Sequence, residues 1–199
     1  MGAKALASPS VLFSHLYSVA EYLELERRTG ERHEFVNGKI TKMAGGSINH
    51  NLLTANIIHE LKNNLDEMDN MYVFGSDQKV YLPEFNVYVY PDAVVICGTP
   101  IVSDKDSQAI TNPLVIIEVL SPSTQDYDKI EKFNDYRTLP SFKEYVLISQ
   151  DKAKVTTYFR EENGTWSIND FRNIEDNVFF KSLDISVLMS KIYKRVVWR

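Results

Sequence analysis

Two apolar runs, PDAVVIC (Pro91–Cys97) and LVIIEVL (Leu114–Leu120), decide the fold of this chain. Unbroken runs of Val, Ile and Leu of this length predict strands that are buried on both faces of a sheet. Each run carries one carboxylate, Asp92 near the start of the first and Glu118 inside the second. A carboxylate in a buried strand is costly unless it is paired, hydrogen-bonded or bound to a metal. The two acids therefore predict a functional site carried by two strands.

The segment before these runs predicts a helix, a hairpin, a second helix and a meander of strands. Apolar residues recur at helical spacing over residues 16–28, and Asn37-Gly38 is the dipeptide that favours a tight hairpin turn. A long helix is expected over 48–68, and residues 71–97 alternate like a meander. We expect Glu21, Glu24 and Glu26 on the outer face of the first helix, and Leu52, Ala55, Ile58, Leu61 and Leu65 on the inner stripe of the second.

The segments after the first run predict a loop, a helix and further strands. Residues 98–113 lack periodicity and are expected to form a surface loop. The turn SPST offers Ser123 or Thr124 as the cap of a helix over about 125–138, which Pro140 ends. Residues 144–149 and 154–160 then predict an antiparallel pair, and two short strands follow. The tail, residues 187–197, fits a helix or a strand.

The composition is that of an ordinary globular protein, with 44% hydrophobic and 25% charged residues among 199. We expect a flexible lead-in over residues 1–10 and a single domain over 11–199. The single Cys97 allows no disulfide within the chain, and neither a leader nor a membrane-length apolar run is present, so we expect a cytoplasmic protein without membrane contact. The net charge of −5 argues against binding nucleic acid by bulk electrostatics alone. A carboxylate site whose charge bound cations offset remains compatible with a nuclease.

A hard divalent cation would fit between Asp92 and Glu118 if the two strands are adjacent and in register. Magnesium takes about six oxygen ligands and keeps several waters, so two carboxylates and the carbonyl of Val119 form a suitable protein contribution; Mn²⁺ is an alternative. Such an ion lowers the pKa of a bound water and stabilises the charge that develops in a phosphoryl displacement. Leu120 stands where a strand lysine would be expected. We expect Lys132 to replace that lysine from the following helix.

A shared helical face supports this choice of lysine. Lys129, Lys132 and Tyr136 are spaced by three and four residues, so they lie on one side of the helix. If that side faces the strands, Lys132 would reach a metal-bound phosphate and Tyr136 would hydrogen-bond beside it. Gln78, on the alternating run DQKVYL, could approach the phosphate or simply face solvent.

The motifs RHEFVNGKI, SDQKV, YPDAVVIC, LVIIEVLSPST, DKIEKFNDYR and FKEYVLIS resemble the bacterial Uma-two family of restriction-endonuclease-like proteins. The resemblance covers about residues 11–191 and implies the PD-(D/E)XK nuclease fold, an α/β (α+β) core with a mixed central sheet flanked by helices, with extra antiparallel strands. It implies Asp92 and Glu118 as metal ligands, Lys132 as the migrated lysine, and frequent dimerisation. Glu34 matches an early glutamate of the family and is a candidate further ligand.

Each candidate also has a purely structural interpretation. Asp92 could cap a turn, Lys132 could be a solvated helix lysine, and Glu34 could form an ion pair with a neighbouring basic side chain. His50 opens a helix near the predicted cleft, although a lone histidine there is more often structural. Ser121 and Ser123 lack the surroundings of a serine nucleophile, and neither a phosphate-binding loop nor zinc-ligand spacing is present.

The leading hypothesis is a magnesium-dependent endonuclease that hydrolyses DNA phosphodiester bonds as a homodimer. In this hypothesis Asp92 and Glu118 hold the metal, Lys132 positions water or phosphate, and Glu34 and Gln78 assist. The alternative is a non-catalytic protein of the same fold that binds nucleic acid or a protein partner, which the acidic charge and the absent strand lysine favour. A structural dimerisation module is a third interpretation.

Overall fold

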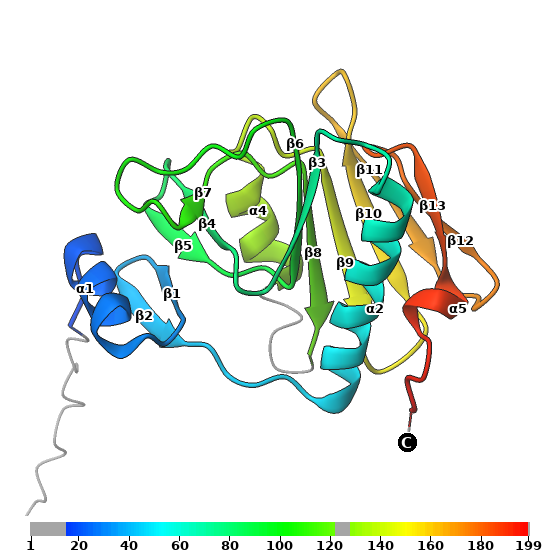
Figure 1. Cartoon of the computed structure of the whole chain (residues 1–199), viewed down its shortest axis with the longest axis horizontal. Helices are drawn as coiled ribbons and strands as arrows, with labels where there is room; N and C mark the ends of the chain where they lie inside the picture. The colour runs from blue at the N-terminus through cyan, green and yellow to red at the C-terminus, as the bar shows by residue number, and fades with distance from the viewer. Residues whose placement is uncertain (1–14, 122–127, 199) are drawn as a thin grey trace, which may run out of the picture.

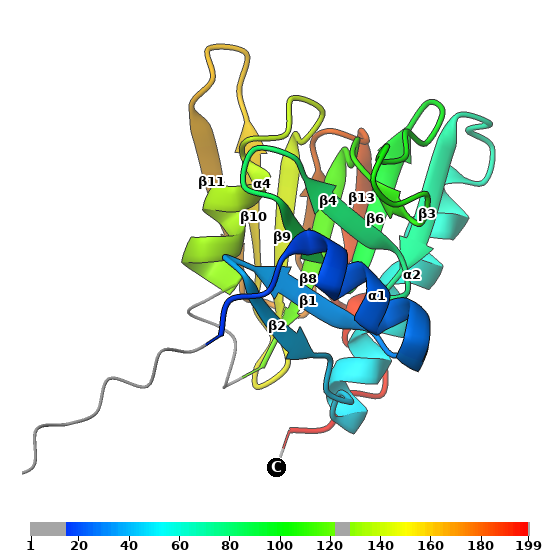
Figure 2. The same ribbon diagram turned by 90° about the vertical axis from the view of Figure 1, so that its left-hand side faces the viewer.

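Two mixed sheets share one hydrophobic core in the computed structural model, which describes residues 15–121 and 128–198 (Figure 1). Figure 2 shows the smaller sheet and the first helix lying in front of the larger sheet. The fold is therefore α+β, with antiparallel strands added to a mixed core, as the sequence predicts. Within the described residues, no helix is long and apolar enough to cross a membrane.

The larger sheet contains both apolar runs, which pair directly with each other. Strand β6 (Ala93–Cys97) lies antiparallel to β8 (Val115–Leu120), with Ala93 opposite Ile117. All residues of both strands except Cys97 are buried. The sheet order is β11-β10-β9-β8-β6-β3, where only β8 and β9 pair in parallel. Its other strands are β3 (Met71–Gly75), β9 (Glu144–Ser149), β10 (Val155–Arg160) and β11 (Trp166–Phe171).

The smaller sheet has the order β2-β1-β5-β4-β7. The predicted hairpin is confirmed, because Asn37 and Gly38 both adopt positive φ, 51° and 76°, between β1 and β2. Its strands are β1 (His33–Val36), β2 (Lys39–Lys42), β4 (Lys79–Leu82), β5 (Val87–Val89) and β7 (Ala109–Ile110).

Two predictions about these strands are wrong. Residues 71–97 are not one meander, because β4 and β5 leave the larger sheet and join the smaller one. Both strands are buried along their whole length, so they need cover on each face: the first helix supplies one cover and the larger sheet the other. The stretch 98–113 is not only a surface loop, since its residues Ala109–Ile110 are buried and pair in parallel with β4.

Helix α1 (Val19–Thr29) covers the outer face of the smaller sheet. Ser18 and Glu21 form a capping box at its start, and Gly30 ends it at φ 66°. Tyr22 is fully buried and stacks on Phe35. Glu26, predicted to face outward, instead lies inward, where it accepts hydrogen bonds from the sheet.

Helix α2 (Ile48–Leu65) covers the outer face of the larger sheet. The predicted inner stripe is confirmed at Leu61 and Leu65, but in the first half of the helix it is displaced by about one residue, and Ala55 is exposed. The sequence allows both faces because Leu52-Leu53 and Ile57-Ile58 are consecutive apolar pairs. The buried residues are Leu53, Ile57, Glu60, Leu61 and Leu65.

The helix predicted over about 125–138 is present in its described part. It consists of a π-helical turn, η1 (Asp128–Lys132), followed by α4 (Phe133–Tyr136). The proposed caps Ser123 and Thr124 and the side chain of Lys129 lie outside the described residues. At the C-terminus, a hairpin of β12 (Asn177–Phe180) and β13 (Ile185–Leu188) leads into α5 (Met189–Ile192). The tail thus contains both a strand and a helix.

Candidate active site

The paired ends of β6 and β8 bring Asp92 and Glu118 together. The register that sets Ala93 opposite Ile117 places the residues one step further along, 92 and 118, beside each other. The backbone N–H of Val119 donates a 2.7 Å hydrogen bond to Asp92 Oδ2, which ties the two strand ends. Glu118 is only 4% exposed. The two strands are therefore adjacent and in register, as a site shared by Asp92 and Glu118 requires.

Lys132 lies between two of the predicted acids. Its Nζ is 3.2 Å from Oε1 of Glu118 and 3.0 Å from Oε1 of Glu34. The three groups come from three different elements, β1, β8 and η1. Lys132 is itself buried, so its charge depends on these carboxylates for compensation. Lys132 thus contacts Glu118 from the helical segment, in place of the strand lysine that is absent at Leu120.

Tyr136 lies on the same side of this helical segment as Lys132 and donates a 3.0 Å hydrogen bond to the same oxygen of Glu118. Burial raises the pKa of the Tyr136 phenol well above its ordinary value, and the negative charge of Glu118 raises it further. The phenol therefore stays protonated at neutral pH and acts as a donor to the carboxylate.

His50 joins the site, although the sequence alone favoured a structural role. Its Nε2 is 3.2 Å from Oδ1 of Asp92. Ser47 caps α2 by accepting a hydrogen bond from the His50 backbone N–H. At Gly46, an added Cβ would lie 2.7 Å from His50 Nδ1, so only glycine leaves room for the ring. The signal available in the sequence was the string GGSINH, a glycine pair followed by a cap and a histidine.

Gln78 lies in a different environment. Its amide donates to the carbonyls of Lys79 and Gln108, at 3.0 and 2.9 Å. It therefore supports the loop before β7, and no contact joins it to Asp92, Glu118 or Lys132 within the part of the chain that the structure describes.

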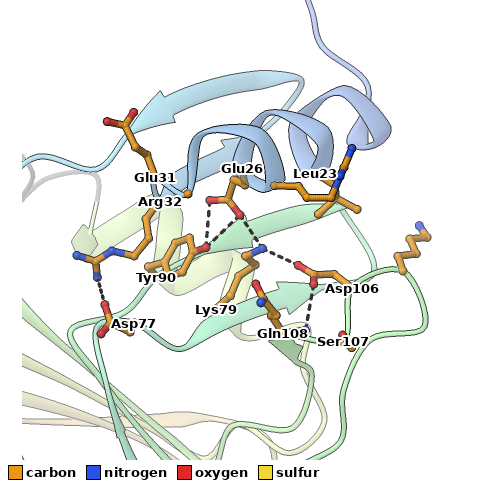
Figure 3. Close-up of a pocket in the computed structure, with 13 residues that line it drawn as sticks. Leu23, Glu26, Glu31, Arg32, Asp77, Lys79, Tyr90, Asp106, Ser107 and Gln108 are labelled. Carbon is orange, nitrogen blue, oxygen red and sulfur yellow. Dashed lines mark hydrogen bonds and ion pairs between the residues drawn. The ribbon is translucent and has the colours of Figure 1, made fainter.

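A second lysine-centred cluster lies under α1, beside a cavity of about 710 Å³ (Figure 3). Lys79 is 3% exposed, and its Nζ is 2.6 Å from both Glu26 Oε2 and Asp106 Oδ2. The hydroxyl of Tyr90 donates to both oxygens of Glu26, and the backbone N–H of His33 donates to one of them at 2.6 Å. The sequence did not predict this cluster, because its members are far apart along the chain.

The donor set at the strand ends suits a hard cation. In the described residues, no three His, Cys, Asp or Glu side chains form a metal-binding group. Magnesium needs few protein ligands because it keeps several waters, so two carboxylates are compatible with it. Each carboxylate oxygen of Asp92 has one contact, to Val119 or to His50, and can accept more than one. The residues at the strand ends are therefore compatible with a hard divalent cation.

The α+β fold with its two mixed sheets is shared with a protein of known structure. A solved structure described as "a putative nuclease", from Anabaena variabilis ATCC 29413, superimposes with a TM-score of 0.68 at 15% identity, covering 85% of this chain and 93% of the other. At that identity the likeness concerns the fold.

Sequence comparison then assigns the family. The chain belongs to the Uma2 family, described as "Putative restriction endonuclease", whose profile matches residues 19–186. Two relatives come from Synechocystis sp. PCC 6803. Uncharacterized protein sll1609 is 36% identical over 88% of this chain and 98% of its own length, and uncharacterized protein slr1290 is 35% identical over 94% and 96%.

Proposed function

We propose that the protein is a metal-dependent endonuclease that hydrolyses phosphodiester bonds in DNA. The observation that carries the proposal is the convergence of Asp92, Glu118, Glu34 and Lys132 at the paired strand ends, from three separate elements and the turn before β6. Asp and Glu side chains are almost never fully buried unless they are paired. Family membership supports a nucleic-acid substrate.

In this proposal Asp92 and Glu118 bind Mg²⁺ or Mn²⁺, with the carbonyl of Val119 as a further ligand. When bound, such an ion would supply a nucleophilic water and would stabilise negative charge on the phosphate. His50 orients Asp92 through Oδ1, while the Val119 N–H holds the other oxygen. The carboxylate is thereby fixed from both sides.

Lys132 provides the positive charge that a phosphate group needs. It is held between Glu34 and Glu118, so its ammonium group is already oriented before a substrate binds. Tyr136 keeps Glu118 in place by a hydrogen bond that persists from neutral into alkaline pH, because the pKa of its phenol is raised. Gln78 is left out of this set because its amide is engaged elsewhere.

Cleavage of a labelled DNA duplex and of a single strand, with Mg²⁺ or Mn²⁺, tests the proposal. Asp92→Asn and Glu118→Gln should abolish cleavage and weaken metal binding measured by calorimetry. The matched controls are Asp69→Asn and Glu24→Gln, which make the same chemical changes at exposed positions. Circular dichroism establishes that each variant is folded. Cleavage that survives in folded Glu118→Gln would refute the proposal.

Binding without cleavage is the second candidate function. Lys132 already compensates two of the acids, so the cluster could be retained as a structural network. In that case metal binding would be absent, the wild type would bind DNA without cutting it, and Asp92→Asn would leave the affinity for DNA unchanged. The homodimer inferred from the family resemblance is part of the first proposal and is tested by light scattering.

A further inference from the structure

The C-terminal segment, residues 193–198, forms a strap along α2. The side chain of Asn56 donates to the carbonyls of Ile192 and Lys194, both at 2.9 Å, and Asn49 donates to the carbonyl of Val197 at 3.0 Å. These two asparagines are seven residues apart on the helix, about 10.5 Å along its axis. The strap therefore runs towards the start of α2, and Figures 1 and 2 both show the chain end there. His50 contacts Asp92 at the same end of the helix.

Trp198 is fixed at the end of this strap with its ring accessible. Its indole N–H donates to the carbonyl of Gln150 at 3.2 Å, and the ring lies 5.5 Å from that of Tyr193. The side chain of Gln150 accepts a 2.6 Å hydrogen bond from Ser47, the cap of α2. Trp198 is nevertheless 42% exposed, and Ile48, beside the same cap, is 81% exposed. An oriented aromatic ring and an aliphatic side chain thus face solvent beside the candidate active site.

The strap is basic in a chain that is acidic. Residues 189–198, which comprise α5 and the strap, contain Lys191, Lys194 and Arg195 and neither Asp nor Glu, although the whole chain has a net charge of −5. Lys191 is paired with Glu60 at 3.2 Å. Lys194 and Arg195 are exposed, and no carboxylate of the described residues lies within ion-pair distance of either. A local positive charge next to an exposed aromatic ring is complementary to a polynucleotide strand.

We propose that the strap binds a single-stranded or unpaired segment of nucleic acid next to the scissile phosphate, which rests on the proposed nuclease function. Trp198 stacks on one unpaired base, Ile48 contacts the neighbouring sugar or base, and Lys194 and Arg195 contact phosphates. A stacked base inside a duplex does not offer its face to such a ring, so the surface selects an unpaired base over a paired one.

The test is a binding titration in a Glu118→Gln background, so that the strand is not cut. A fluorescein-labelled 12-nucleotide single strand and a hairpin duplex of the same sequence serve as probes. Trp198→Ala should weaken binding of the single strand roughly tenfold or more, as expected for one lost stacked base, and change duplex binding little. Lys194→Gln combined with Arg195→Gln should lower the slope of log K against log salt by about 1.4, or about 0.7 for each of two phosphates.

Intrinsic fluorescence provides an independent readout, because the chain has only two tryptophans, Trp166 and Trp198. The single strand should quench emission from Trp166→Phe, in which Trp198 is the only tryptophan, and should quench Trp198→Phe much less. Parent-like affinity of Trp198→Ala for the single strand would overturn the strap proposal and leave the nuclease proposal intact. Failure of the parent to bind either probe at low salt would overturn both.

Discussion

Replacing Lys79 with methionine should be among the most destabilising changes in this protein that leave its shape intact. The ammonium group lies 2.6 Å from each of two carboxylates, Glu26 and Asp106, and the side chain is almost fully buried. Methionine keeps the length and the apolar stem but removes the charge. Two buried carboxylates then face each other without a cation, and breaking a buried ion pair in this way typically costs about 3–5 kcal/mol.

The remaining contacts place the expected loss at the lower end of that range, about 3 kcal/mol. Glu26 keeps its hydrogen bonds from Tyr90 and from the His33 backbone, and Asp106 keeps one from the Gln108 backbone. For a chain of this length, each kcal/mol lowers Tm by about 2–4 °C, so Tm should fall by about 6–12 °C.

Urea denaturation followed by circular dichroism measures this loss, and Lys62→Met, at an exposed position of α2, is the matched control. A triple variant, Glu26→Gln with Lys79→Met and Asp106→Asn, tests the cause. It should recover much of the stability, because no unpaired charge is left. If the single variant loses under 1 kcal/mol, or if the triple variant is no more stable than the single one, the electrostatic explanation is wrong.

Two further predictions concern acidity and packing. The hydrogen bond from Thr156 lowers the pKa of Asp170 from 3.8 to about 2. Between these values the unfolded chain binds more protons, so this stabilisation is complete above about pH 4 and is lost as the pH falls towards 2. Because Asp170 is 34% exposed, we expect Asp170→Asn to cost about 1 kcal/mol at pH 7 and almost nothing near pH 2, measured by urea denaturation at both pH values. Gly46→Ala should crowd His50 and weaken metal binding in calorimetry about tenfold, whereas Gly45→Ala, which meets no atom within 4 Å, should not. Equal metal affinities of the two alanine variants would contradict the packing explanation.

The local sequence pattern predicted the two strands of the site, but it did not predict how the strands of residues 71–97 divide between the two sheets. Two unbroken apolar runs indicated β6 and β8, and each acid within them needed a partner, so Asp92 and Glu118 could be singled out from the sequence. The division of residues 71–97 between two sheets could not be predicted in this way. Burial of β4 and β5 is consistent with either sheet, and only the long-range contacts with α1 and β7 select one.

The inward orientation of the Glu26 side chain also depends on residues that are distant in the sequence. On helical spacing it belongs with the solvated acids of α1, and nothing nearby in sequence offers it a partner. Lys79 and Tyr90, which lie more than 50 residues away, provide the compensation that makes burial tolerable. A role of His50 in the site was hard to predict for the same reason, since its partner Asp92 is 42 residues distant and a lone histidine has no ligand spacing to reveal it.

Hydrogen bonds to Glu26 link the cluster at Lys79 to the segments that carry the candidate active site. Its carboxylate accepts the backbone N–H of His33, the residue before Glu34, and the hydroxyl of Tyr90, two residues before Asp92. The buried cluster therefore anchors the strand that carries one site acid and the turn that carries another. If the site binds a cation, the geometry of the site depends on Lys79, which does not contact the ion. Lys79→Met should consequently weaken metal binding in calorimetry at temperatures where the variant is fully folded. The triple variant should not restore this affinity fully, because Gln at position 26 orients the same two donors less strongly than a carboxylate.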